Sequence, residues 1–238
     1  MNIREHKRSP MVLAAVAVIQ VLSPASPAAV VPFTEDFTAN SANWVFDSAG
    51  TMPLTWNASG GPDGGSYAST TFNFVSTTPG TDKVLFRALP EIGSSGGAFF
   101  GNWIGDGVTE FSAMIRHDAD VPVTFFARFA DPARFPGAFA RLPELIPADT
   151  WTLITVPIDP GNPQWETFEG SNFNAVFDNI GVVQIGIGVP AGVGNVDQTI
   201  TFGLDKVSIV PEPATGLLLA IGALAAARRG PARRVAHP

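Results

Sequence analysis

Short apolar segments separated by glycine- and proline-rich turns fill the chain from about residue 29 to residue 209. Most of them alternate apolar and polar residues or are rich in β-branched and aromatic residues, a pattern typical of half-buried strands. Strands are expected at 33–37, 44–46, 67–75, 83–89, 98–104, 110–116, 122–129, 151–158, 182–189 and 199–209. Because helical segments do not alternate with these strands, the sequence predicts an all-β fold, a two-sheet β-sandwich of the jelly-roll type.

Three local features complete this expected domain, which spans 29–209. The strands 110–116 and 122–129 are close enough for a hairpin across His117–Asp120. One short helix is expected within 172–180. The segment 131–147 is predicted to be a long irregular insertion and, since such loops are often functional, a second candidate ligand-binding face. Its distinctive side chains are Arg134, Phe135, Phe139 and Arg141.

Residues 1–28 have the organisation of a secretory signal peptide. Arg4, Lys7 and Arg8 precede an apolar segment, 11–22, which is followed by small residues and a cleavage site expected after Ala28. We therefore expect an N-terminal signal helix and export through the secretion translocon. The chain has no cysteine, which excludes disulfides and thiolate metal sites.

Residues 210–238 form a tail with three parts. Pro211, Glu212 and Pro213 favour an extended peptide, the apolar run 216–227 favours a hydrophobic helix, and Arg228 and Arg229 favour a basic cytoplasmic end. This order resembles the PEP-CTERM sorting signal of exported bacterial proteins. The resemblance implies an exosortase-type membrane protease as partner, an inner-membrane anchor, and then a cell-surface or extracellular-matrix location. The alternative is a short hydrophobic C-terminal helix of a soluble domain.

The charge of the expected domain narrows the classes of ligand. Between 29 and 209 there are seven basic and 19 acidic residues, a net charge of about −12. Nucleic acids and anionic membrane surfaces require clustered lysine and arginine, so we expect no nucleic-acid partner. Neutral ligands and divalent cations suit this charge better.

A second resemblance concerns the domain itself. The opening Phe33-Thr34-Glu35-Asp36-Phe37, the strand 151–158, the strand 184–188 and the closing segment 203–209 are similar to galactose-binding-like jelly rolls, an architecture shared by many carbohydrate-binding modules. The resemblance implies a structural Ca²⁺ held by Glu35 or Asp36 together with Asp205, which suits the oxygen ligands that calcium prefers. The alternative is that these are ordinary exposed acids at strand ends.

Four aromatic residues stand in or beside glycine-, proline- or asparagine-rich segments, where a ring can be exposed to a sugar. They are Trp56, Tyr67, Trp103 and Trp165. We expect a carbohydrate site among them, with hydrophobic plugs beneath loops as the alternative. Trp44 and Trp151 lie inside apolar strands and are predicted to be core residues.

Catalytic patterns are weak in the domain. His117 is the only histidine between 29 and 209, and Ser95 lies in a glycine-rich stretch without the strand and helix that flank a nucleophile elbow. With 19 acidic residues, chance pairs of carboxylates are inevitable. The sequence therefore predicts an exported, non-catalytic sandwich that binds polysaccharide. The alternatives are a polysaccharide hydrolase or lyase on a concanavalin-like sandwich, and a purely structural matrix protein.

Overall fold

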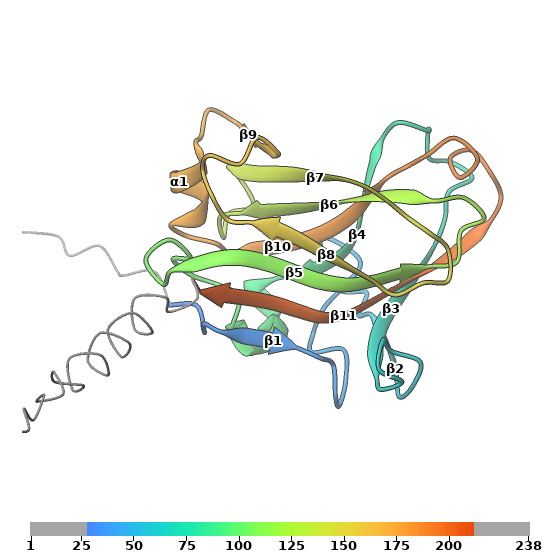
Figure 1. Cartoon of the computed structure of the whole chain (residues 1–238), viewed down its shortest axis with the longest axis horizontal. Helices are drawn as coiled ribbons and strands as arrows, with labels where there is room; N and C mark the ends of the chain where they lie inside the picture. Colours follow the sequence, from blue (N-terminus) through green and yellow to red (C-terminus); the bar gives the residue numbers. More distant parts are fainter. Residues whose placement is uncertain (1–27, 212–238) are drawn as a thin grey trace, which may run out of the picture.

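The computed structural model describes residues 28–211, which form two antiparallel sheets packed face to face (Figure 1). Sheet A has six strands in the order β2-β3-β11-β5-β8, with β1 paired to β11, and sheet B has five in the order β4-β10-β6-β7-β9. The strands of sheet A are β1 (Phe33–Glu35), β2 (Thr55–Asn57), β3 (Tyr67–Asn73), β5 (Val108–His117), β8 (Thr152–Pro157) and β11 (Thr199–Pro211). Those of sheet B are β4 (Asp82–Ala88), β6 (Val123–Ala130), β7 (Gly137–Ile146), β9 (Trp165–Phe168) and β10 (Val182–Gly188). The predicted all-β sandwich is confirmed.

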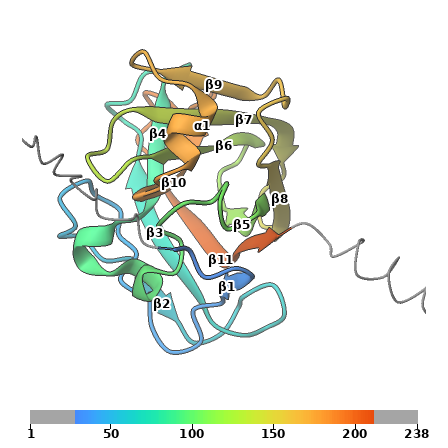
Figure 2. The same ribbon diagram turned by 90° about the vertical axis from the view of Figure 1, so that its left-hand side faces the viewer.

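Alternation along the strands places the core between the two sheets. In β5, Phe111, Ala113 and Ile115 are fully buried, and in β6 the inward residues include Phe129. The rings of Phe111 and Phe129 meet edge to face across the interface, with centroids 5.1 Å apart. The helix α1 (Phe173–Phe177) closes one end of the sandwich between the layers (Figure 2). Each large side chain buried in this way contributes roughly 1.5–3 kcal/mol.

Most predicted strands lie within a few residues of their expected positions, with two exceptions. Segment 44–46 makes only isolated bridges, through Val45 to Pro53 and to Arg87. Segment 98–104 contains turns and a single bridge from Gly101 to Ile180. The preceding stretch holds two short 3₁₀ helices, Pro90–Ile92 and Ser94–Gly97, so the prediction of a strand at 98–104 was wrong.

The predicted hairpin between 110–116 and 122–129 is also wrong, because β5 belongs to sheet A and β6 to sheet B. The chain changes sheets at His117, whose side chain is buried. Its Nε2 donates to the Ile146 carbonyl oxygen (2.9 Å), and its Nδ1 accepts from the Ala119 N–H (3.2 Å). The histidine thus fixes a corner between the sheets where the sequence suggested a turn within one sheet.

The segment 131–147 is a regular strand over most of its length rather than an irregular insertion. The segment contains four prolines, each of which lacks the N–H that a strand donates to its neighbour. Pro143 is tolerated because it falls where the register between β6 and β7 shifts, between the pairs Phe126–Arg141 and Thr124–Leu145. At such an irregularity a missing N–H costs little.

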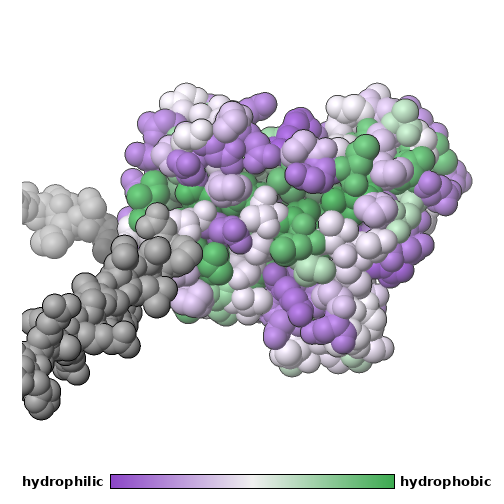
Figure 3. All heavy atoms as spheres, in the orientation of Figure 1, coloured by the Kyte–Doolittle hydropathy of each residue, from purple (hydrophilic) through white to green (hydrophobic). Residues whose placement is uncertain are grey.

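The predicted signal peptide, apart from Ala28, and the tail residues Glu212, Pro213, Arg228 and Arg229 lie outside the described residues. Pro211 is the last residue of β11, paired with Val108. Among residues 28–211, no helix is long and apolar enough to cross a membrane. On the face seen in Figure 3, hydrophobic residues surface as separate patches among hydrophilic ones.

Candidate functional site

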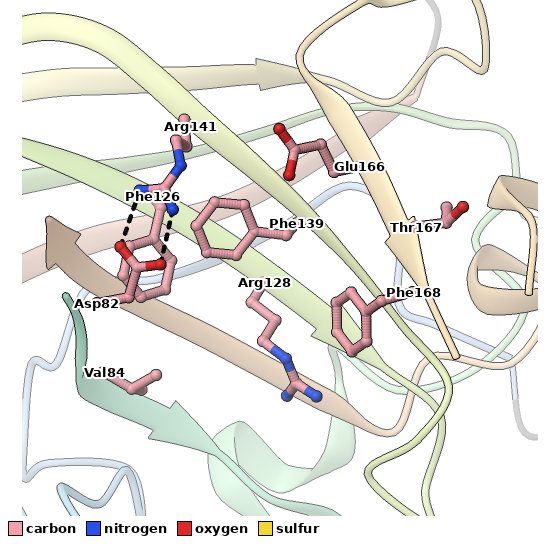
Figure 4. Close-up of a pocket in the computed structure, with 9 residues that line it drawn as sticks. All are labelled: Asp82, Val84, Phe126, Arg128, Phe139, Arg141, Glu166, Thr167 and Phe168. Carbon is pink, nitrogen blue, oxygen red and sulfur yellow. Dashed lines mark hydrogen bonds and ion pairs between the residues drawn. The ribbon is translucent and has the colours of Figure 1, made fainter. Parts of the chain in front are cut away.

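A pocket of about 360 Å³ hollows the outer face of sheet B. It combines aromatic rings with charged side chains carried by β4, β6, β7 and β9 (Figure 4). The lining residues are Asp82, Val84, Phe126, Arg128, Phe139, Arg141, Glu166, Thr167 and Phe168. We call this pocket the sheet B site.

Strand register explains why these residues meet. Gln184 of β10 pairs with Arg128 of β6, Arg128 pairs with Phe139 of β7, and Phe139 pairs with Glu166 of β9. Paired residues point to the same face of a sheet, so these four form one row across it. In β6, β7 and β10 their neighbours in sequence are buried in the core, which leaves the row on the outer face.

The aromatic part of the site is built on Phe139. Its ring stacks on that of Phe126, with centroids 4.6 Å apart and an interplanar angle of 29°. Phe126 itself is almost completely buried. It fits because Gly186 beside it has no side chain: a Cβ at Gly186 would lie 2.4 Å from the Phe126 ring. The half-buried Phe139 ring therefore has a rigid support beneath it.

Two arginines supply the polar part. Arg141 donates to both carboxylate oxygens of Asp82, at 2.8 and 2.7 Å. This pair, with a smaller contribution from nearby Glu166, raises the pKa of Arg141. Arg128 donates to Gln184 Oε1 (2.9 Å) and to the Arg134 carbonyl oxygen (3.0 Å), and burial lowers its pKa.

The arrangement is suited to binding a flat, polyhydroxylated molecule. The Phe139 ring offers an apolar surface, the arginines offer N–H donors, and Asp82 and Glu166 offer acceptors. It is less suited to acid catalysis, because the Asp82 carboxylate is already engaged by two donated hydrogen bonds from Arg141.

The predictions missed most of this site because they looked for tryptophan and tyrosine in loops. Only Phe139 and Arg141 were named, as parts of a supposed insertion. The signal that was present is the period-two spacing Phe126-x-Arg128 and Phe139-x-Arg141, which places aromatic and cationic side chains on one face of neighbouring strands.

Trp103 is a correction to the predicted carbohydrate site. It was expected to be exposed because Gly101 and Gly105 flank it, but it is fully buried. Its indole Nε1 donates to the Phe99 carbonyl oxygen (2.7 Å), and its ring lies 5.0 Å from that of Phe129. The turn folds beneath the end of the sandwich, where a large ring fills the space between the sheets.

Trp165 also packs mainly against core residues. It is half-buried on β9, with its ring 5.0 Å from Phe177 and 5.7 Å from Phe129, and its Nε1 donates to the Pro157 carbonyl oxygen. It lies next to the residue Glu166 of the sheet B site, but its own side chain does not line that pocket.

Trp56 and Tyr67 are not brought together. Trp56 pairs with the buried Ala68, whereas Tyr67 pairs with Asn57, so the two rings point to opposite faces of sheet A. Trp56 is 40% exposed, and Tyr67 packs edge to face on Trp151, with centroids 5.3 Å apart.

Trp151, predicted to be core, is half-buried and lies on the outer face over Gly203. Trp44 is fully buried, as predicted.

The residues expected to hold calcium are only partly assembled. Asp36 and Asp205 line a pocket of about 170 Å³ together with Asp63 and Lys206, whereas Glu35 does not line it and instead accepts from the Phe37 N–H. Lys206 Nζ lies 3.0 Å from Asp63, so a cation from the protein already balances this carboxylate. Within residues 28–211, no group of three or more histidine, cysteine, aspartate or glutamate side chains is placed to hold a metal. Of the three residues predicted to hold calcium, only Asp36 and Asp205 therefore line a common pocket, and the metal stays a prediction.

Asp205 is nevertheless the most perturbed carboxyl in the described chain. It is 1% exposed. Burial raises its pKa to about 6, against a hydrogen bond from the Lys206 N–H to its Oδ1 that lowers it.

Comparisons with known proteins find similarity only among solved structures. No family model matches the sequence, and no curated protein matches it. Among solved structures, a family 11 carbohydrate-binding module of a cellulosomal cellulase from Clostridium thermocellum is 12% identical, with a TM-score of 0.46, over 77% of this chain and 96% of the module.

Two larger proteins are similar to this chain over part of their length. The CBM22–GH10 modules of a Clostridium thermocellum endo-1,4-β-xylanase are 14% identical, with a TM-score of 0.44 over 76% of this chain. An exo-β-agarase is 12% identical, with a TM-score of 0.49 over 77% of this chain. The chain spans only 28% of the xylanase modules and 26% of the agarase. The class of the protein, a two-sheet antiparallel β-sandwich, is defined by its own strand order.

Proposed function

We propose that the protein is a non-catalytic carbohydrate-binding protein whose ligand lies on the sheet B site. The observation that carries this proposal is the half-exposed Phe139 ring, which is supported from below by Phe126 and surrounded by Arg128, Arg141 and Glu166. Sugar rings have apolar faces and polar edges. A flat ring with hydrogen-bonding groups at its border matches both.

The test compares two aromatic truncations in the full-length chain. Phe139→Ala removes the proposed stacking surface, and Trp56→Ala removes an exposed ring from sheet A. With ligands found on a glycan array, calorimetry should show about tenfold weaker binding for Phe139→Ala, the loss expected for one aromatic contact, and unchanged binding for Trp56→Ala. Loss of binding in Trp56→Ala alone would move the site to sheet A.

A reducing-sugar assay on the same polysaccharides separates the remaining functions. Binding without sugar release supports the proposal, whereas release would establish the hydrolase alternative. If no glycan on the array binds and no sugar is released in the assay, the results would favour a purely structural matrix protein.

We also propose, on the sequence alone, that the protein is exported and sorted by its tail. The signal peptide at the front and the proline-glutamate-proline, apolar and basic segments at the end favour the same topology. Replacement of Pro211, Glu212 and Pro213 by alanine should leave the protein unprocessed in the inner membrane of its host. Normal release of that variant would count against handling by an exosortase.

A further inference from the structure

The cations of the domain are concentrated in one region. Five of the seven basic residues between 28 and 211 belong to β4, β6, β7 or the loop between β6 and β7. They are Lys83, Arg87, Arg128, Arg134 and Arg141. The domain has a net charge of about −12, so this region carries more positive charge than the rest of the domain.

Within this group, Arg128 stands in the sheet B site without an ion-pair partner. Among residues 28–211, Arg134 pairs with Glu91 and Arg141 pairs with Asp82, but no carboxylate lies within ion-pair distance of Arg128. Its fixed partners are neutral oxygens, Gln184 Oε1 and the Arg134 carbonyl. A partly buried positive charge with no negative charge beside it costs free energy. A ligand that brings a negative charge to Arg128 would therefore recover part of this cost when it binds.

The guanidinium of Arg128 is held in place but retains free donors. Its central carbon lies 5.0 Å from the ring centroid of Phe168 and 5.5 Å from that of Phe135, which fixes the plane of the group. Two of its five N–H groups are used by the protein, and three remain. Arg128 Nε makes no hydrogen bond within residues 28–211, yet it is not among the buried side-chain atoms that lack a partner, so its N–H remains accessible to a ligand.

The site is therefore polarised. At one end Arg141 is matched by Asp82 and lies near Glu166, and at the other end Arg128 stands beside Phe168 (Figure 4). A ligand lying over Phe139 meets acceptors at the first end and, at the second, a guanidinium that no carboxylate of residues 28–211 contacts directly, although the charge of Glu169 acts on it from a greater distance. A planar guanidinium favours planar anions, above all carboxylates, which it can bind through two parallel hydrogen bonds.

We propose that Arg128 binds the carboxylate of a uronic acid, so that the sheet B site selects acidic polysaccharides over their neutral counterparts. This inference rests on the proposed function, since it names the glycan class of the same site. Arg128 then acts as a specificity-determining residue, whereas Phe139 contributes to binding any glycan there.

The test uses matched ligands that differ only in charge. Tetrasaccharides of galacturonate, of mannuronate and of glucuronate are compared with their methyl esters by calorimetry on the full-length chain. For at least one sugar the acid should bind about tenfold tighter than its ester, the scale expected for a charge-assisted pair. Arg128→Gln should abolish that preference, so that the acid and its ester bind with equal affinity. Arg128→Lys should retain only part of the preference, because lysine lacks the planar fork.

Arg116→Gln is the matched control, because it removes an arginine from sheet A and should preserve the preference. The four arginines near the C-terminus could also attract acidic ligands, and Arg128→Gln leaves them in place. If Arg128→Gln still prefers the acid over the ester, the preference does not come from Arg128 and the inference is overturned. Equal affinity of acid and ester for all three sugars would also overturn it, as would tighter binding of a sulfated carrageenan oligosaccharide. If neutral glycans still depend on Phe139, the proposed function stands without the inference; if nothing binds, both fail.

Discussion

Replacing the buried carboxyl of Asp205 by an amide tests the electrostatics of the fold most directly. Burial raises the pKa of Asp205 from 3.8 to about 6, so the folded state binds its proton more tightly than the unfolded state. The stabilisation associated with this raised pKa is complete below 3.8 and is lost as the pH rises toward 6. A difference of about two pKa units corresponds to about 3 kcal/mol at pH 8, which is an upper bound.

Asp205→Asn should remove the free-energy cost of burying a charged carboxylate at high pH. The amide oxygen can still accept from the Lys206 N–H, and the repulsion from Asp36 and Asp63 disappears. We expect the variant to be more stable than the wild type by about 1–3 kcal/mol at pH 8 and equally stable at pH 4. Urea unfolding followed by tryptophan fluorescence from pH 4 to pH 8, in the presence of a chelator, measures the difference.

Two results would refute this reasoning. In the chelator, a variant that is less stable than the wild type at pH 8 would mean that the charged carboxylate is well compensated in the folded protein. In calcium, a rise in the melting temperature of the wild type but not of the variant would show that Asp205 is a metal ligand. That outcome would restore the calcium prediction made from the sequence.

Other positions give simpler predictions. Gly186→Ala should destabilise the fold by about 3 kcal/mol in chemical denaturation, because a Cβ would lie 2.3 Å from the Lys83 carbonyl oxygen. Trp103→Ala should cost about 4 kcal/mol in the same assay, as for other large aromatic truncations in cores, whereas an exposed loop tryptophan would cost little. Arg141→Ala should change stability by less than about 1 kcal/mol, since its side chain is 56% exposed, yet weaken glycan binding. Burial lowers the pKa of His117 below 6.5, so the stability tied to its neutral form is present above pH 6.5 and is lost as the pH falls; the difference in stability between the wild type and His117→Gln should shrink or reverse below that value.

The fold was predictable because local patterns and burial agree in most strands. β5 alternates between buried and half-buried residues, β10 is apolar except for Gln184, and the core residues Trp44 and Phe111 lie where the pattern places them. The pairing of strands was not predictable in the same way. A five-residue connection such as 118–122 suits a hairpin and a change of sheet equally well. The buried side chain of His117 selects the change of sheet, through a contact with Ile146 that is distant in sequence.

The site was harder to predict because its residues come from strands that are adjacent only in the folded sheet. Residues 82, 128, 141 and 166 become neighbours through the order β4-β10-β6-β7-β9, which the sequence does not reveal. A search for exposed aromatic residues in loops favoured Trp103, which packs in the core, and overlooked Phe168. Asp36 and Asp205 do line the same pocket, as the jelly-roll resemblance implied.

The position of β11 has a consequence for the order in which the protein can fold. This last strand of the described chain pairs with β1 and β3, which come early, and with β5 from the middle. Until residues 199–211 are available, β1, β3 and β5 lack the strand that joins them in sheet A. Long-range pairing of this kind slows folding and favours completion after synthesis. Pro211, where the predicted sorting motif begins, is also the last residue of β11, so the strand that completes sheet A ends where that motif starts.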